Sequence, residues 1–259
     1  MGNKCLIKQE IREHEEAFQN IFCTTFDFSK AFKKNEDDLI TLMYDHHQFV
    51  TKKEDIIVDD IYEAIKYQKE HNCNYLKIDS RFALSKELVT AFKLEESITL
   101  TMVNLKSNDK LAKHFTINPD VVIKDVQVAP IEEDLLAIYL KNYEEDCGKE
   151  FIKQVTNTFC LKAKKDKRLH YLGAYLNDEI CGYCYYFDDG HYKVLDGLTV
   201  NRESRHQYVA SSLISYIINA SDSIMYLHAD KNDTPQAMYR KMGFEDIDIL
   251  YEYMCTNLE

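Results

Sequence analysis

The feature that most constrains the fold is the segment from Leu198 to Leu213, LTVNRESRHQYVASSL, because it joins two kinds of periodicity. Its first residues alternate as in a strand, and after a polar turn at Arg205 the apolar residues Val209 and Leu213 recur at helical spacing. The segment predicts a strand that enters a helix at Arg205. The first N–H groups of a helix lack intrahelical partners and lie at the positive end of its dipole, so we expect this turn to bind phosphate.

The composition indicates a compact intracellular protein. The chain has 259 residues, 45% of them hydrophobic, which is enough for one large or two small domains, and seven glycines with three prolines leave little material for disordered linkers. No apolar run reaches the roughly 20 residues that span a bilayer, and the N-terminus lacks the apolar segment of a signal peptide. We therefore expect a soluble, cytoplasmic protein that does not enter a membrane.

The charge balance argues against nucleic acid as a partner. The formal net charge is −12, with 44 acidic and 32 basic residues, and it would repel a phosphate backbone or an anionic membrane. Basic residues concentrate only between Lys162 and Arg168, without interleaved aromatic residues. We interpret that run as a solvated helix end.

The eight cysteines are scattered, which favours reduced thiols over a disulfide framework. The one close pair, Cys181 and Cys184, is open to a redox or zinc interpretation. However, it lies in a strand-like run where side chains three apart point to opposite faces, and no second pair completes a zinc site. We favour two ordinary strand cysteines and expect no metal.

The pattern of elements predicts an α/β fold with a mixed sheet. In the first half we expect helices within 1–35, over 59–70 and after Ser85, which can cap the last of them, and strands over 39–44, 48–51, 74–79 and 96–105. In the second half we expect a strand over 121–129, helical residues after Pro130, an antiparallel meander of 170–176, 180–187 and 192–200, the helix from Arg205, and then a strand, helix and strand over 224–228, 234–242 and 248–255.

This element order from residue 121 to 259 resembles the GNAT N-acetyltransferase family, and two motifs support the resemblance. The acyl-CoA signature of that family (Gln or Arg, two residues, Gly, one residue, Gly or Ala) is similar to Arg205-His-Gln-Tyr-Val-Ala210, although Tyr208 stands where a glycine is usual. The second motif is Asn232, seven residues on Tyr239, and then Gly243-Phe244. Each residue also has an ordinary role in packing or capping.

The resemblance implies an N-acetyltransferase that uses acetyl-CoA as co-substrate, with direct attack of the acceptor amine on the thioester. The pantetheine arm would follow the open edge of the strand, the pyrophosphate would lie on the N–H groups of the turn, and Asn232 would assist. The implied coenzyme-binding residues are therefore Leu198, Thr199, Val200, Arg205, His206, Gln207, Tyr208, Val209, Ala210, Ser211 and Asn232. Tyr239 would be the general acid that protonates the departing thiolate, since a phenol is ordinarily protonated at neutral pH.

Three residues are candidates for the base that takes the proton of the amine. Asp196, Glu203 and His228 could each act directly or through a water. The acidic charge balance favours a cationic acceptor amine, and the interpretation also admits a homodimer. If Tyr208 has ordinary helical backbone angles, its N–H is still presented to a phosphate and only the clearance changes.

The N-terminal half repeats a strand, helix and strand. Tyr75–Asp79, Phe92 and Ile98–Met102 parallel Tyr226–Asp230 and Phe244 with the strand that follows. We interpret residues 1–118 as a degenerate GNAT-like domain and 119–259 as the GNAT domain. The alternatives are a GNAT-like CoA-binding or regulatory protein without catalysis, and an aminoacyl transferase that uses tRNA, against which the acidic charge counts.

Overall fold

The computed structural model describes residues 2–23, 40–42, 48–51, 55–70, 75–105, 116–232 and 235–258. The chain divides into two compact units. Unit 1 comprises Met1–Met102, His228–Gln236 and Asp246–Glu259, and unit 2 comprises Val103–Leu227 and Ala237–Glu245. The predicted division at residue 118 stays a prediction.

Unit 1 is built on a mixed sheet. Its strand order is β1 (Ile40–Leu42), β2 (Gln48–Thr51), β3 (Leu76–Ser80), β10 (Glu245–Cys255) and β4 (Glu95–Asn104). The β1–β2 pair is antiparallel, β2–β3 is parallel and β3–β10 is antiparallel. These strands follow the predicted ranges within a few residues.

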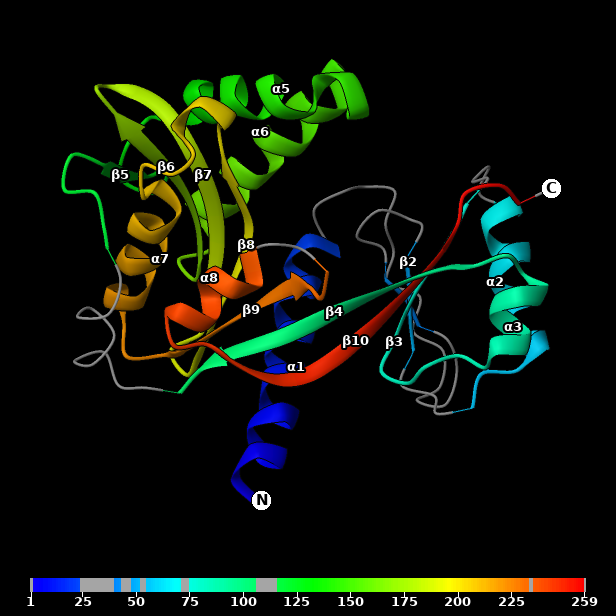
Figure 1. Ribbon diagram of the computed structural model, residues 1–259. Coiled ribbons are helices and arrows are strands. Elements are labelled where there is room, and N and C mark those ends of the chain that lie inside the picture. The colour runs from blue at the N-terminus through cyan, green and yellow to red at the C-terminus, as the bar shows by residue number, and fades with distance from the viewer. Residues whose placement is uncertain are drawn as a thin grey trace. The chain divides into compact units, whose positions relative to one another are not determined.

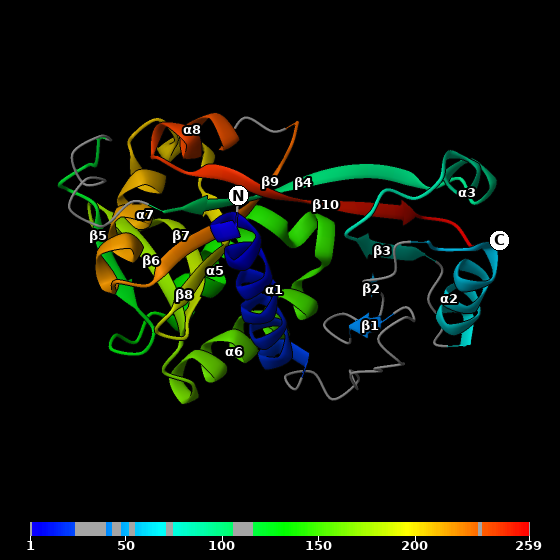
Figure 2. The same cartoon turned by 90° about the horizontal axis from the view of Figure 1, so that it is seen from below.

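The helices of unit 1 are α1 (Gly2–Cys23), α2 (Val58–Glu70) and α3 (Lys86–Ala91). In both Figure 1 and Figure 2, α2 and α3 lie beside the chain end marked C. Ser85 caps α3 as predicted, because its hydroxyl accepts the N–H of Leu88. Ile61 of α2, Leu88 of α3 and Ile78 of β3 share one buried core.

The internal repeat is present, but its register differs from the prediction. In the second copy, Gly243 has a φ of 91°, and the N–H of Phe244 donates to the carbonyl of Tyr239 over 3.0 Å. In the first copy, Lys93 has a φ of 50°, and the N–H of Leu94 donates to the carbonyl of Val89 over 2.9 Å. The residue equivalent to Phe244 is therefore Leu94, and the predicted match to Phe92 is wrong. The prediction fails because Lys93 adopts the positive φ that Gly243 has in the second copy.

Unit 2 contains the predicted antiparallel meander. Its elements are β5 (Val122–Asp125), α5 (Glu132–Cys147), α6 (Lys149–Lys165), β6 (Leu169–Leu176), β7 (Glu179–Asp188), β8 (Tyr192–Val200), α7 (Val209–Ala220), most of β9 (Ile224–Asp230) and most of α8 (Pro235–Lys241). The strand order is β9-β8-β7-β6-β5, with β8–β9 parallel and the other pairs antiparallel. β5 is shorter than predicted, because residues after Asp125 form a turn.

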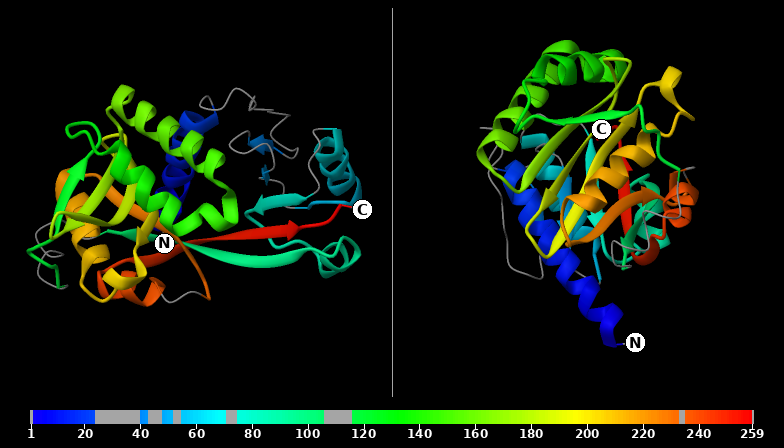
Figure 3. Two further views of the ribbon diagram at one scale, coloured as in Figure 1. Left: turned by 90° about the horizontal axis from the view of Figure 1, so that it is seen from above. Right: turned by 90° about the vertical axis from the view of Figure 1, so that its left-hand side faces the viewer.

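Helices cover both faces of this sheet (Figure 3). On one face, Phe159 of α6 packs on Tyr185 with ring centroids 4.8 Å apart, and Tyr139 of α5 packs on Tyr183 at 5.6 Å. On the other face, Gly182 approaches Val209 of α7 so closely that an added Cβ would lie 3.0 Å from its methyl carbon. Because successive residues of β7 point to opposite faces, these contacts place α5 and α6 opposite α7.

A buried lysine of β8 closes the C-terminal end of α7. The Nζ atom of Lys193 donates to the carbonyls of Ile217, Ile218 and Ser221 at 2.9, 3.0 and 2.8 Å. Its side chain is 1% exposed, and burial lowers its pKa while the charge of Asp188 opposes that shift. The ammonium supplies the last carbonyls of the helix with donors that the helix itself cannot provide.

The two close cysteines, Cys181 and Cys184, have buried thiols. Cys181 and Cys184 are both free and buried in β7, and Sγ of Cys181 donates to the carbonyl of Ala174. Burial raises the pKa of both thiols.

Among the residues that the structure describes, no helix is long and apolar enough to span a membrane.

Candidate functional site

The turn between β8 and α7 has a more irregular backbone than the sequence predicts. A short 3₁₀ turn covers Arg202–Ser204, and α7 begins at Val209 rather than at Arg205. His206 and Tyr208 have φ values of 64° and 61°, in the left-handed region. The prediction of a helix from Arg205 is therefore wrong by four residues, because two non-glycine residues adopt backbone angles that sequence patterns assign to glycine.

The turn presents a row of backbone donors. The first intrahelical bond of α7 runs from the N–H of Ser212 to the carbonyl of Tyr208. Within the described part of the chain, the backbone N–H groups from His206 to Ser211 donate to no protein acceptor. Donors of this kind at the positive end of a helix favour an anion such as a phosphate.

Neighbouring segments hold the turn without using those donors. Asn118 donates its backbone N–H to the hydroxyl of Ser212 over 3.0 Å and its side-chain N–H to the carbonyl of Gln207 over 3.1 Å. The Nε atom of Arg205 donates to the carbonyl of Val200 at 3.4 Å, which keeps its positive charge near the end of β8. The predicted phosphate turn is therefore held by contacts that leave its N–H groups unused, and the guanidinium of Arg205 lies against the end of β8.

Tyr208 shows a clear departure from the expected helical angles. It is the N-cap residue of α7, with φ 61° and ψ 20°, and its side chain is 53% exposed. A left-handed conformation costs a non-glycine residue about 1–2 kcal/mol. The position thus requires the backbone that glycine adopts freely, and the ring points outward instead of filling the turn.

Replacing Tyr208 with glycine is expected to raise the free energy of unfolding by about 0.5–1 kcal/mol, since the relief of strain exceeds the added chain entropy. Urea unfolding followed by circular dichroism measures the change. Gln207→Gly is the matched control, because Gln207 lies in the same turn without a positive φ. A glycine at that position should therefore lower the free energy of unfolding of the protein. Equal effects of the two substitutions would contradict a strained Tyr208.

The strand edge next to the turn is open along its last residues. The parallel register of β8 with β9 runs from Tyr192 to Leu195 of β8. Beyond it, β8 is registered with β7, where Thr199 lies opposite Tyr183 and Val200 opposite Gly182. Among the described residues, Leu198–Val200 have no registered strand partner on the other edge. This is the edge predicted to receive an extended ligand.

A β-bulge interrupts β8 just before that edge. Tyr183 and Tyr185 of β7 lie opposite Thr199 and Asp196, so two residues of β8 face one residue of β7. Gly197 has a φ of 61°, and a Cβ there would collide with the ring of Tyr185. The bulge places Asp196 and Thr199 on the same face, where the hydroxyl of Thr199 lies 3.1 Å from that of Tyr143 on α5.

The three candidate bases have different environments. Asp196 is exposed, and its carboxylate accepts the N–H of Gly197 at 2.7 Å. Glu203 pairs with Lys141 of α5, and the hydrogen bond from that ammonium lowers the pKa of Glu203. A lowered pKa makes Glu203 a weaker proton acceptor. His228 lies in unit 1.

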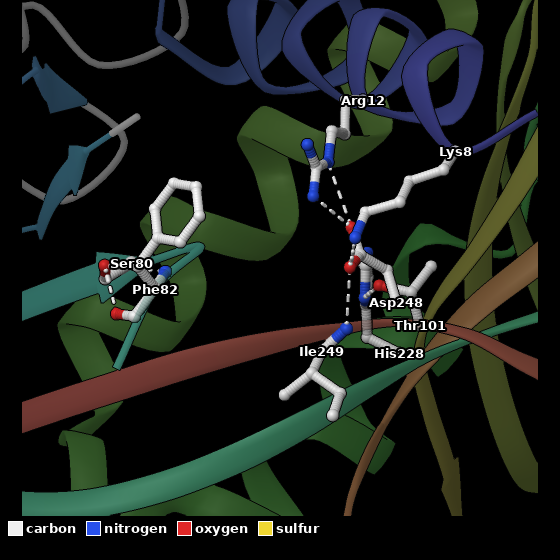
Figure 4. A network of polar contacts seen from close by, with 8 residues as sticks. All are labelled: Lys8, Arg12, Ser80, Phe82, Thr101, His228, Asp248 and Ile249. Atoms are coloured by element: carbon white, nitrogen blue, oxygen red, sulfur yellow. Dashed lines mark hydrogen bonds and ion pairs between the residues drawn. The ribbon is translucent and has the colours of Figure 1, made fainter. Parts of the chain in front are cut away.

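His228 lies among polar contacts of unit 1, where Figure 4 shows it beside Thr101. Its Nε2 atom lies 2.7 Å from a carboxylate oxygen of Glu15, and its Nδ1 atom lies 3.3 Å from the hydroxyl of Thr101. Burial raises the pKa of Glu15, but the charge and hydrogen bond of His228, together with the charges of Arg81 and His14, lower it below its ordinary value. These residues line a cavity of about 60 Å³ together with Arg12, whose Nε atom donates to Asp248 at 2.9 Å.

The second predicted motif is only partly described. Tyr239 of α8 belongs to unit 2, as the turn does, and it is 7% exposed with its ring 6.0 Å from that of Phe244 in an edge-on arrangement. Asn232 belongs to unit 1, and its N–H donates to Asp230 over 2.7 Å. Residue 234, where the predicted helix over 234–242 begins, lies outside the described residues.

Sequence reasoning missed the contribution of α5 to the turn. Asn142 donates its side-chain N–H to the carbonyl of Ile138 and to the amide oxygen of Asn201, the latter at 3.0 Å. With the Lys141–Glu203 pair, this contact ties α5 to the first residues of the turn. The partners are about sixty positions apart in the chain, and no local periodicity indicates such a contact.

A family model described as "Acetyltransferase (GNAT) family" matches residues 129–244, a segment that contains the meander, the turn and Tyr239. None of the curated proteins compared with the chain matches its sequence.

Solved structures extend the similarity of fold. A functionally unknown conserved protein from Staphylococcus epidermidis ATCC 12228 is 18% identical with a TM-score of 0.73, and the match covers 88% of this chain and 94% of that one. A tandem GNAT protein from the clavulanic acid biosynthesis pathway is 12% identical, with a TM-score of 0.56 over 85% and 78%. A GCN5-related N-acetyltransferase from Kribbella flavida is 12% identical, with a TM-score of 0.54 over 87% and 89%. These matches confirm the predicted mixed α/β fold and reach beyond residues 129–244.

Proposed function

Because residues 129–244 match the model of the GNAT acetyltransferase family, we propose that the protein transfers an acetyl group from acetyl-CoA to a primary amine. The observation that carries the proposal is the row of backbone N–H groups from His206 to Ser211. They would hold the pyrophosphate of the coenzyme, with Arg205 beside them. The open edge of Leu198–Val200 would receive the pantetheine arm as an added extended segment.

The proposed chemistry is direct attack of the amine on the thioester carbonyl. Binding both partners in one orientation supplies much of the rate, since it replaces an encounter in solution with an ordered one. Tyr239 would donate a proton to the departing thiolate. Asp196 and Glu203 are the candidate carboxylates in unit 2 for accepting the amine proton, and the hydrogen bond from Lys141 lowers the pKa of Glu203. His228 remains a third candidate, and the net charge of −12 favours a cationic acceptor.

Acetyl-CoA is expected to raise the melting temperature. A ligand at a hundred times its Kd stabilises the folded state by about 2.7 kcal/mol. Arg205→Ala should weaken the affinity by at least about tenfold, because a hydrogen bond to a charged group contributes about 1.5–3 kcal/mol. A thermal-shift titration measures both effects.

The control for that titration is Arg168→Ala. Arg168 also lies in unit 2 and pairs with Asp166 over 2.8 Å, so its loss removes the same charge at another place. It should leave the affinity unchanged. An unchanged melting temperature of the wild-type protein at saturating acetyl-CoA would exclude both the enzyme and a catalytically inactive CoA-binding protein, whereas binding without turnover on a panel of amines would favour the inactive protein.

A further inference from the structure

A groove in unit 2 lies on the α7 side of the sheet, and its lining includes Asn118 and Ser212, which also hold the turn. It has a volume of about 640 Å³. Its walls include Ile123 and Asp125 of β5, His170 of β6, Tyr186 of β7, and Tyr216 and Asn219 of α7. Sites for small molecules combine such an apolar and aromatic lining with a few placed polar groups.

An aspartate and a histidine form the polar centre of the groove. One carboxylate oxygen of Asp125 lies 2.6 Å from Nδ1 of His170, and the other accepts the N–H of Gln127 at 2.9 Å. His170 and Tyr186 lie directly opposite each other on paired strands, and their rings stack 4.3 Å apart at 4°. The imidazole is therefore fixed in both position and orientation.

This arrangement determines what the groove offers a ligand. An ionised carboxylate only accepts hydrogen bonds, so Nδ1 of His170 is the donor to Asp125, and Nε2 is an acceptor when the imidazole carries one proton. In the described part of the chain, neither Nε2 of His170 nor the hydroxyls of Tyr186 and Tyr216 have a hydrogen-bond partner. Tyr186 is 3% exposed, so its unpartnered hydroxyl belongs to a buried side chain that lines the groove.

The fixed charge in the described lining of the groove is that of Asp125, which contacts His170. The described lining contains no other carboxylate and no lysine or arginine. Burial and then the charge of Asp125 raise the pKa of Tyr216, and burial and Asp125 likewise raise the pKa of Tyr186. Both phenols therefore stay neutral, and their rings offer faces that attract a cation.

We propose that this groove binds a small organic cation with a primary ammonium group. The ammonium donates to Nε2 of His170 and to the two phenol oxygens, while Asp125 supplies the compensating charge through the imidazole. The alkyl part of the ligand packs on Ile123. The site uses the side of α7 that carries Tyr216 and Asn219, and the proposed coenzyme uses the N-terminus of that helix.

The test uses n-butylammonium chloride as the probe with the full-length protein. Histidine ring resonances in a long-range ¹H–¹⁵N spectrum should show a saturable shift at His170, assigned by its loss in His170→Gln. Tetramethylammonium, which has no N–H donor, and 1-butanol, which has no charge, should each bind at least tenfold more weakly. If either competes equally with butylammonium, the proposed recognition is wrong.

Asp125→Asn is expected to weaken butylammonium binding at least tenfold. The amide removes the negative charge, and its NH₂ group donates to Nδ1, which turns Nε2 into a donor. Tyr216→Phe should weaken binding by a smaller factor and keeps the test informative if Asp125→Asn does not fold. Asp178→Asn, an exposed carboxylate in the turn after β6, is the matched control and should change nothing.

Three results would overturn the proposal: no saturable shift in the wild-type protein, equal affinity in Asp125→Asn and Asp178→Asn, or equal affinity in Tyr216→Phe and the wild type. The site does not depend on the proposed acetyl transfer. The acetyl-CoA thermal shift, measured in the same Asp125→Asn protein, should stay at its wild-type value. Failure of the coenzyme to bind therefore tests the proposed function alone, and failure of butylammonium tests the groove alone.

Discussion

Replacing Tyr239 with phenylalanine is expected to lower kcat about a hundredfold, the lower end of what general acid catalysis contributes. The substitution removes one oxygen from a ring that is 7% exposed and packs against Phe244, so the fold should persist with a loss of about 1 kcal/mol. Release of the free thiol of CoA, followed with a chromogenic disulfide, gives kcat. The KM for acetyl-CoA should change little, because the hydroxyl acts on the leaving group.

The control for this substitution is Tyr192→Phe. Tyr192 is also 7% exposed, but it begins β8, at the opposite end of the strand from Leu198–Val200. It should retain wild-type turnover. If Tyr239→Phe also retains it, Tyr239 has a packing role only, and the proton for the thiolate comes from another group or from solvent.

Replacing Lys193 with methionine is expected to lower the free energy of unfolding by about 3 kcal/mol, because three carbonyls at the end of α7 lose their charged donor. Methionine nearly fills the volume of the aliphatic stem, so the effect reports the ammonium rather than a cavity. The midpoint of urea unfolding measures the change.

Lys153→Met provides the comparison for Lys193→Met. Lys153 lies on α6 and pairs with Glu150 at 2.9 Å on the surface, where an ion pair contributes little. Its replacement should change the stability by less than about 0.5 kcal/mol. Similar midpoints for the two variants would mean that solvent satisfies the α7 carbonyls when the ammonium is absent.

The parts of the fold that the sequence predicts are those with regular periodicity. The meander from residue 169 to 200 follows from alternating apolar residues between short polar turns, and the cap of Ser85 on α3 follows from local chemistry. The predicted start of α7 is wrong because His206 and Tyr208 adopt left-handed backbone angles although neither is a glycine. The predicted alignment of the two copies of the repeat is wrong for the same reason, because Lys93 has a positive φ without being a glycine.

Long-range contacts account for the rest of the site. Neither the tie from Asn142 to Asn201 nor the burial of Lys193 has a local signal, since both depend on how distant elements pack. A lysine within a strand ordinarily indicates a solvated position. The groove at His170 likewise depends on a register between β5, β6 and β7 that periodicity alone does not determine.

The bulge at Gly197 changes how β8 must be aligned with relatives. In an uninterrupted strand, residues three apart face opposite sides, yet Asp196 and Thr199 share a side here. The strand thus displays polar groups at a spacing that ordinarily belongs to a helix. An alignment that carries a simple alternation through Gly197 assigns Leu198 to the position that Thr199 occupies. The assignment of functional residues at the C-terminal end of this strand can therefore be transferred between relatives only after the extra residue of the bulge has been located in each.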